Sequence, residues 1–289
     1  MWGNGDGANS ENIRADRVGR CRAGPVVQLG LLQGRRRPQF ACMFDSLPSG
    51  SPFLTHVELR RERAQPDVHP FTLPILEHGL ELEFTTPVTF FVGENGSGKS
   101  SVLEALAWCN GFGLHGGNRD HHFVEDAEGY ALGRALKLEW QQRTADGFFL
   151  RAETFHQFSA QLEETGTEFA RYGGRSFNQR SHGEAFLALF EHRFEDGLYL
   201  LDEPEAALSP QRQLAFLRIM HDLATRKIAQ FIVATHSPIL LCLPGARILS
   251  FDNGTIEPVD VRDTDHFQIT RDFLNDPDRF FRYLFAEDE

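Results

Sequence analysis

The 289-residue sequence lacks several features that mark particular classes of protein. No apolar run approaches the 18 or so residues that span a membrane, so we expect no membrane insertion. The four cysteines lie far apart and form no C-x-x-C pair, which argues against a zinc site and against a disulfide framework. Scattered cysteines suit a reducing compartment, and the sequence therefore predicts a cytoplasmic protein.

Basic residues are also scarce, and lysine occurs only at Lys99, Lys137 and Lys227. The formal net charge is −12. Residues 1–42 hold seven arginines and three acidic residues, so the rest of the chain carries a charge of about −16. An acidic body binds nucleic acid poorly unless it has a local basic face. Nucleic acid is therefore a possible partner that the net charge does not support.

The first 46 residues are rich in glycine and arginine and show no apolar periodicity. This composition predicts a disordered tail, followed by a folded domain over residues 47–289. Met43 could be the native start, in which case the preceding residues would come from translated upstream sequence. N-terminal sequencing of the native protein tests that hypothesis, because residues found before Met43 would reject it.

What the sequence does contain is a stretch, Gly93 to Ser100, that fits the pattern G-x-x-x-x-G-K-[ST]. It follows the apolar, β-prone run Val88–Val92 and precedes a helix-forming run over residues 101–108. Glycines let backbone N–H groups converge on phosphate oxygens, and the helix N-terminus attracts negative charge. A glycine turn with a chance lysine is the alternative, and both flanks argue against it.

This pattern predicts a triphosphate site in which Lys99 reaches the β- and γ-phosphates and the Ser100 hydroxyl binds Mg²⁺. The residues expected to contact the nucleotide are Gly93, Glu94, Asn95, Gly96, Ser97, Gly98, Lys99, Ser100 and Ser101.

A second apolar strand, Leu198–Leu201, ends in Asp202 and Glu203. In open α/β folds ligands bind at the carboxyl edge of the parallel strands, where Asp202 would lie. We expect Asp202 to hold Mg²⁺ and Glu203 to activate the attacking water. The alternative is a strand followed by an acidic turn.

A third buried strand, Gln230–Ala234, ends just before His236, which could hydrogen-bond a γ-phosphate there. Taken by itself, His236 would more readily be interpreted as a histidine with a structural role. Its place on the strand that follows Asp202 and Glu203 favours a contact with the γ-phosphate instead. Ser181 and Glu184 form a capping box at a helix start, which with Gly183 is also an anion site. His115, His121 and His122 lie in a glycine-rich segment that is a solvated loop or, less favoured, a metal site.

Several other elements can be placed from pattern alone. Residues 136–143 and 147–155 are predicted to form a strand pair, and residues 246–259 a hairpin around Asn253-Gly254. A helix is expected to begin at Ser209-Pro210, and the tail from Phe267 to Leu284 to be helical with a break at Asp276-Pro277. The buried stripe expected on the first of these helices is Leu214, Leu217, Met220 and Ala224.

These motifs, in this order, resemble the ABC class of P-loop ATPases, over roughly residues 53–250. The chain looks most like the stand-alone bacterial AAA-family or predicted ATPases, on the SMC and RecF side of the class. The corresponding motifs are Walker A (Gly93–Ser100), signature (Ser181–Glu184), Walker B with its glutamate (Leu198–Glu203), D-loop (Ala206–Ser209) and His-switch (His236).

The resemblance implies an α/β fold: a mostly parallel central sheet flanked by helices, an antiparallel β subdomain and a small helical insert. It implies ATP and Mg²⁺ as cofactors and ATP hydrolysis with Glu203, His236 and Lys99 as catalytic residues. It also implies an ATP-dependent homodimer in which Ser181 and Gly183 contact the γ-phosphate bound by the other chain. The sequence departs from the family at His182 and at Ser209, where transporter subunits usually have Gly and Asp.

Some assignments and the cellular role stay open at this point. Gln157 and Glu153 are both candidates for the Q-loop residue, and Phe71 is a candidate to stack on adenine. Only about 80 residues separate Ser100 from Ser181, which leaves no room for a long coiled-coil arm. A soluble switch in DNA maintenance or defence, a transporter's ATP-binding subunit, and a module that uses ATP only to dimerise are all compatible with the motifs. The client protein is unknown.

Overall fold

The computed structural model describes residues 50–113, 127–144, 146–155, 182–193 and 196–286. Four of the sequence predictions fall outside the described residues: the disordered tail, the three histidines of the glycine-rich segment, Gln157 and Ser181. In the part of the chain that is described, no helix is long and apolar enough to cross a bilayer.

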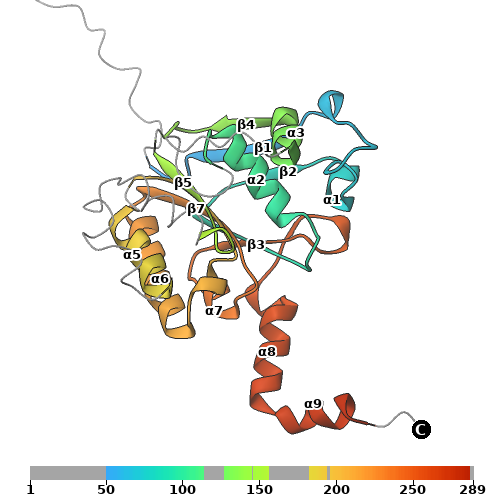
Figure 1. The fold of residues 1–289 in the computed structure, drawn as a ribbon, viewed down its shortest axis with the longest axis vertical. Helices are drawn as coiled ribbons and strands as arrows, with labels where there is room; N and C mark the ends of the chain where they lie inside the picture. Colours follow the sequence, from blue (N-terminus) through green and yellow to red (C-terminus); the bar gives the residue numbers. More distant parts are fainter. Residues whose placement is uncertain (1–49, 114–126, 145, 156–181, 194–195, 287–289) are drawn as a thin grey trace, which may run out of the picture. The chain divides into compact units, whose positions relative to one another are not determined.

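The larger sheet has six strands in the order β5-β6-β7-β3-β8-β9 (Figure 1). Neighbouring strands are parallel except at β9, which is antiparallel to β8. Parallel strands covered on both faces need continuous apolar runs, and β3, β6 and β7 are buried along their whole length. The strands are β3 (Val88–Val92), β5 (Gly147–Arg151), β6 (Gly197–Asp202), β7 (Ala229–Ala234), β8 (Arg247–Ser250) and β9 (Glu257–Pro258).

A smaller antiparallel sheet is formed by β1 (Leu54–Leu59), β2 (Glu81–Glu83) and β4 (Leu136–Trp140), in the order β2-β1-β4. The fold therefore combines a mostly parallel sheet with an antiparallel one, as the resemblance to ABC-class ATPases implies. The predicted pairing of residues 136–143 with 147–155 is wrong, because β4 and β5 belong to different sheets. β4 alternates apolar and charged residues, whereas β5 carries the buried run Phe148–Leu150, which suits a covered parallel strand.

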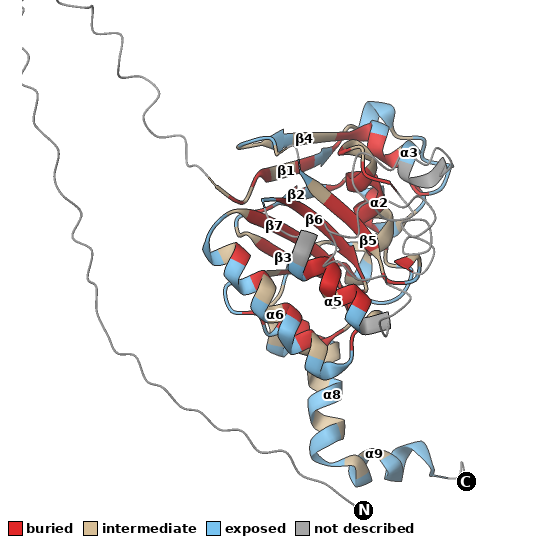
Figure 2. Cartoon of the chain, turned by 60° about the vertical axis from the view of Figure 1, so that its left-hand side comes forward, coloured by how far each residue is buried: buried red, intermediate tan, exposed pale blue. Residues whose placement is uncertain are grey.

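Two hydrophobic cores cover the two faces of the larger sheet (Figure 2). One unites the smaller sheet with α2 (Lys99–Cys109) and α3 (Ala127–Ala135), and includes Phe91 and Leu200 of the larger sheet. The other lies under α5 (His182–Arg193), α6 (Pro210–Thr225) and α7 (Pro238–Leu241), and includes Phe90 and Leu201. Because side chains alternate along a strand, neighbouring residues of β3 and β6 supply opposite cores.

The predicted stripe on α6 is only partly right. Met220 is buried, but Leu214 is 59% exposed, and the remaining buried positions are Gln213, Phe216 and Leu223. Gln213 can be buried because its amide nitrogen donates to Leu208 O at 3.0 Å and its oxygen accepts from the Ser237 hydroxyl at 2.5 Å. Apolar spacing alone could not anticipate a buried glutamine.

The remaining helices include α1 (Pro74–Glu77) beside the glycine loop and α8 (Asp265–Asn275) followed by α9 (Pro277–Leu284) at the C-terminal end. The predicted hairpin and the helical tail with its break at Asp276 are confirmed. Short 3₁₀ turns are η1 (Arg61–Arg63), η4 (Pro204–Ala207), η5 (Asp252–Gly254) and η6 (Val261–Asp263).

Candidate phosphate-binding and catalytic site

The glycine loop joins β3 to α2, and its backbone takes conformations that suit glycine. Gly93, Gly96 and Gly98 have φ angles of 138°, 81° and 99°. A Cβ atom on Gly98 would lie 2.6 Å from Ile75 Cδ1, so a side chain there would force the Ile75 side chain to move. Strand, loop and helix therefore have the form that the sequence predicts, with α2 beginning at Lys99.

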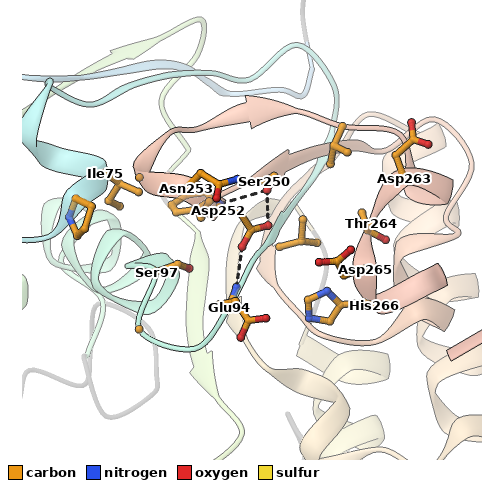
Figure 3. A pocket seen from close by; sticks show the side chains of 16 residues that line it. Ile75, Glu94, Ser97, Ser250, Asp252, Asn253, Asp263, Thr264, Asp265 and His266 are labelled. Carbon is orange, nitrogen blue, oxygen red and sulfur yellow. Dashed lines mark hydrogen bonds between the residues drawn. The ribbon is translucent and has the colours of Figure 1, made fainter. Parts of the chain in front are cut away.

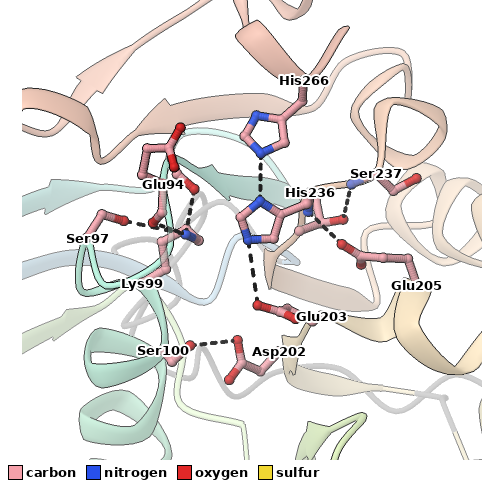
Figure 4. A network of polar contacts seen from close by, with 12 residues as sticks. Glu94, Ser97, Lys99, Ser100, Asp202, Glu203, Glu205, His236, Ser237 and His266 are labelled. Atoms are coloured by element: carbon pink, nitrogen blue, oxygen red, sulfur yellow. Dashed lines mark hydrogen bonds and ion pairs between the residues drawn. The ribbon is translucent and has the colours of Figure 1, made fainter. Parts of the chain in front are cut away.

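Lys99 is only 5% exposed, and its ammonium is held inside the loop (Figure 4). Its Nζ donates to the carbonyl oxygens of Gly93 at 2.7 Å and Glu94 at 2.8 Å. Burial lowers the pKa of Lys99, while the nearby carboxylates of Glu203 and Asp202 oppose that shift. A cation held by backbone carbonyls can exchange those partners for stronger phosphate acceptors.

The Ser100 hydroxyl donates to Asp202 Oδ1 at 3.1 Å, so the start of α2 meets the end of β6. These are hard oxygen ligands of the kind that Mg²⁺ prefers. No group of three His, Cys, Asp or Glu suited to a metal occurs among the described residues. Mg²⁺ sites often use one or two protein oxygens plus substrate phosphates, and the Ser100 hydroxyl and the Asp202 carboxylate are oxygens of that kind, so the residues present fit this ion.

Arg151 is a residue of the site that sequence reasoning missed. It ends β5 in register with Asp202, and its Nε donates to Asp202 Oδ2 at 3.0 Å. Its guanidinium also forms an ion pair with Glu104 of α2. Burial opposes ionisation, yet Asp202 and Glu104 outweigh it and raise the pKa of Arg151. The sequence feature that could have identified Arg151 is a single arginine at the end of an apolar strand.

Glu203 follows Asp202 with φ 48° and ψ 51°, the left-handed conformation that is uncommon for a glutamate. Burial raises the pKa of the Glu203 carboxyl, and Asp202 and Glu153 raise it further, whereas Lys99 opposes them. Its carboxylate faces the His236 ring (Figure 4), with Oε1 at 3.6 Å from Nε2. The exposed Glu153, a Q-loop candidate, therefore acts on Glu203 through its charge.

His236 lies just beyond β7 and is held by two residues that the sequence did not single out. Its backbone N–H donates to Glu205 Oε1 at 2.5 Å, and its ring Nδ1 lies 2.6 Å from His266 Nε2. Its Nε2 is buried and has no hydrogen-bond partner among the described residues. Burial lowers the pKa of His236, and Lys99 and His266 add to that effect.

A pocket of about 440 Å³ adjoins the glycine loop (Figure 3). Glu94, Gly96 and Ser97 line one side, η5 another, and the start of α8 a third. The Glu94 backbone N–H donates to Asp252 Oδ1 at 2.9 Å, which ties the loop to η5. Burial acts to raise the pKa of the Asp252 carboxyl. Hydrogen bonds from Ser250 and Glu94 outweigh burial, and the pKa of Asp252 is lowered.

Two further predicted residues can be placed and one cannot. Gly183 lies in the first turn of α5, whereas Ser181 falls outside the described residues. Phe71 is buried in the core under the smaller sheet, so it offers no free face for stacking on adenine. The structure thus brings Lys99, Ser100, Asp202, Glu203 and His236 together at one edge of the sheet.

Two family models match the chain. The model described as "AAA domain" matches residues 69–139, which include the glycine loop. The model described as "AAA domain, putative AbiEii toxin, Type IV TA system" matches residues 184–241, which include Asp202, Glu203 and His236.

Two curated relatives match different parts of the chain. A DNA replication and repair protein RecF from Heliobacterium modesticaldum is 39% identical over 69 residues, which are 24% of this chain. The match spans only 17% of that relative. A hemin import ATP-binding protein, HmuV from Pseudomonas aeruginosa, is 29% identical over 202 residues, 61% of this chain and 77% of the relative.

The solved structures that match the chain are more distant in sequence. The SMC head domain from Thermotoga maritima is 18% identical, with a TM-score of 0.41, covering 72% of this chain and 98% of that one. A putative metal-chelate type ABC transporter in an inward-facing conformation is 19% identical, with a TM-score of 0.39, covering 64% of this chain and 76% of that one.

Proposed function

Since the chain is a P-loop ATPase of the ABC class, on the SMC and RecF side of that class, we propose that it binds ATP with Mg²⁺ and hydrolyses it to ADP and phosphate. The observation that carries the proposal is the hydrogen bond from Ser100 to Asp202. It places the start of the glycine-loop helix against the acidic end of β6, with the Lys99 ammonium buried beside them.

Binding would rest on the glycine loop. Its amides and the Lys99 ammonium would neutralise the charge of the β- and γ-phosphates. Mg²⁺, when held by Ser100 and Asp202, supplies further neutralisation of phosphate charge. Arg151 keeps the Asp202 carboxylate paired and oriented through its bond to Oδ2, which leaves Oδ1 directed at Ser100.

Hydrolysis would be completed by Glu203 and His236. Glu203 accepts a proton from water, the water oxygen bonds to the γ-phosphorus, and the bond from that phosphorus to the bridging oxygen breaks. The His236 Nε2–H donates a hydrogen bond to a γ-phosphate oxygen and keeps its proton. The raised pKa of Glu203 suits a base, because a weakly basic carboxylate would accept the proton less readily.

Removal of the base tests the reaction. Glu203→Gln keeps the size of the side chain and should lower kcat by roughly 10²–10⁴ while ATP binding is retained. Phosphate release is measured beside Glu257→Gln, which changes an exposed glutamate of β9. Unchanged turnover in Glu203→Gln would remove Glu203 from the mechanism. Phosphate release that depends on Glu203 would exclude a module that uses ATP only to dimerise.

Removal of the ammonium tests the binding site. Lys99→Ala should abolish ATP binding in calorimetry, because the phosphates lose their buried cation. Lys137→Ala is the matched control, since the Lys137 side chain on β4 is 42% exposed and its surface ion pairs contribute little. An affinity retained by Lys99→Ala would contradict the assignment of the loop.

We further propose that ATP drives formation of a homodimer, in which Ser181 and Gly183 of one chain face the nucleotide of the other. The proposal rests on the resemblance of residues 181–184 to the signature motif. Glu203→Gln with ATP and Mg²⁺ should then accumulate as a dimer in size-exclusion chromatography with light scattering. A monomer at every ATP concentration would reject the dimeric switch.

The favoured cellular role is a cytoplasmic switch in DNA maintenance or defence. The RecF relative and the toxin-family model support it, whereas the net charge of −12 weighs against direct DNA binding. Fluorescence anisotropy with labelled duplex DNA at two salt concentrations, with and without ATP, tests it. Absence of any ATP-dependent, salt-sensitive binding would count against this role.

The second candidate is the ATP-binding subunit of a transporter, which the 202-residue match to HmuV favours. The two roles differ in the client they require. Glu203→Gln trapped with ATP and used as bait should capture DNA or a DNA-processing protein in the first case. In the second case it should capture a membrane-spanning protein.

A further inference from the structure

His266 lies in the first turn of α8 and touches the ring of His236 from the side away from Glu203 (Figure 4). The two ring nitrogens, His236 Nδ1 and His266 Nε2, are 2.6 Å apart. The ring centroids are 4.8 Å apart and the planes meet at 37°. Contact at this distance requires one hydrogen between the two nitrogens, since two lone pairs would repel.

That shared hydrogen fixes where the other proton of His236 lies. If His236 Nδ1 carried the hydrogen, the neutral ring would leave a lone pair on Nε2, directed at Glu203 Oε1 only 3.6 Å away. If His266 Nε2 carries it, His236 Nδ1 is the acceptor and Nε2 bears an N–H that faces the carboxylate. Electrostatics favour the second arrangement, because an N–H next to a carboxylate attracts and a lone pair repels.

The start of α8 is well placed to hold His266 in this position. Thr264 is a buried N-cap whose hydroxyl accepts from the Phe267 N–H and donates to Val261 O at 2.8 Å. Gln268 donates from its side chain to Arg262 O at 2.9 Å. The turn that carries His266 is thus tied to η6, while the His236 backbone is tied separately to Glu205.

We propose that His266 is a positioning residue that holds His236 in the tautomer with its proton on Nε2, and so aims a donor at the γ-phosphate. The inference rests on the proposed ATP hydrolysis for its consequence, but not for the tautomer itself. It assigns α8 a part in the reaction, since the helix supplies the group that orients the His-switch residue.

Three variants separate a donor from mere packing. His266→Gln keeps an N–H donor at similar reach, so its kcat should stay within about threefold of the unmodified protein. His266→Leu fills the space without a donor, so its kcat should fall roughly 10–100-fold with the ATP Kd unchanged, as is usual when a supporting hydrogen bond is lost. His221→Leu, at an exposed position of α6, is the control for loss of a histidine and should change neither value.

Long-range ¹H–¹⁵N spectra of the nucleotide-free protein report the tautomer without any turnover. The His236 signals are assigned among the 12 histidines by their loss in His236→Asn. We expect the Nε2-protonated pattern in the unmodified protein and in His266→Gln, and a mixed or inverted pattern in His266→Leu. A proton on Nδ1 in the unmodified protein overturns the inference, whether or not His266→Leu folds.

The two readouts also separate this inference from the proposed function. An Nε2 proton that depends on His266, in a protein that releases no phosphate from ATP, would reject the ATPase and keep the positioning role. If instead the protein releases phosphate normally, and His266→Leu changes neither the tautomer of His236 nor kcat, the ATPase is kept and the positioning role of His266 is rejected.

Discussion

Glu205 is an acidic side chain that the fold partly buries beside His236. Its Oε1 accepts from the His236 backbone at 2.5 Å. Burial raises the pKa of the Glu205 carboxyl above its ordinary value of 4.5, although the hydrogen bond from His236 opposes the shift. A carboxyl pKa raised by folding means that the folded state holds the proton more tightly. The contribution of the protonated Glu205 carboxyl to the free energy of unfolding is therefore fully present below pH 4.5. It is lost as pH rises through the pKa of Glu205 in the folded state.

Glu205→Gln should therefore become progressively more stable than the unmodified protein as pH rises. The variant keeps an oxygen for the His236 N–H but cannot ionise. The difference in unfolding free energy should grow by up to about 1.4 kcal/mol per pH unit between pH 4.5 and the raised pKa. Urea unfolding at pH 5 and pH 8 measures it, with Glu62→Gln as an exposed control. An equal difference at both pH values would show that Glu205 does not titrate in a buried setting.

At the scale of single residues, the sequence predicted correctly where a side chain lies when the residue belongs to a contiguous motif. Lys99 and Ser100 are fixed by the glycine loop, and Asp202 by its place at the end of a strand. Arg151 could not be found in this way, because its partner Asp202 lies 51 positions away and becomes its neighbour only through strand register. His266 lies 30 positions from His236 and becomes its neighbour only once the start of α8 has packed beside it.

At the scale of elements, the glycine loop depends on backbone freedom and on the fit against α1. Gly98 has a φ of 99°, and a Cβ there would meet Ile75 at 2.6 Å. Gly245 has a similar φ of 79°, but nothing lies within 4 Å of its Cβ position. A substituted residue would therefore adopt the left-handed conformation at either position, but only at Gly98 would its Cβ atom also clash with a neighbouring side chain.

Gly98→Ala should lower the free energy of unfolding by more than Gly245→Ala does. The left-handed conformation costs a non-glycine residue about 1–2 kcal/mol at both positions, and the contact with Ile75 adds to this at Gly98 alone. ATP affinity should fall at least tenfold in Gly98→Ala and stay unchanged in Gly245→Ala. Chemical denaturation and calorimetry measure the two quantities. Equal effects of both substitutions would mean that the loop yields to the extra methyl group.

The elements that sequence patterns misplaced are those whose partners are distant. Alternating apolar and charged residues identified β4, and a run of apolar residues identified β5. Neither pattern indicates which other strand pairs with it in the sheet. The sequence Ala145-Asp146-Gly147 favoured a hairpin, whereas burial of Phe148 and Phe149 on opposite faces required two covering layers. On α6, Gln213 took a core position because the Ser237 hydroxyl and Leu208 carbonyl were there to receive it.

At the scale of the whole molecule, the two C-terminal helices differ from every layer that covers the sheet. Neither α8 nor α9 contains a buried residue (Figure 2). Leu274, Tyr283 and Phe285 are 71%, 80% and 74% exposed. Phe280 and Phe281 of α9 make ring contacts with Phe273 of α8. Since burial supplies most of the stability of a fold, α9 should contribute little.

Deletion of residues 277–289 should therefore change the free energy of unfolding by less than about 1–2 kcal/mol, the scale of a few aromatic contacts. It should also leave kcat unchanged, because His266 and the start of α8 remain. Deletion of residues 265–289 removes His266 as well and should lower kcat to the level of His266→Leu. Urea unfolding and phosphate release compare the two truncations. Loss of kcat in the shorter deletion would show that α9 acts on the site, and that the connection from α8 to His236 requires the whole C-terminal pair of helices.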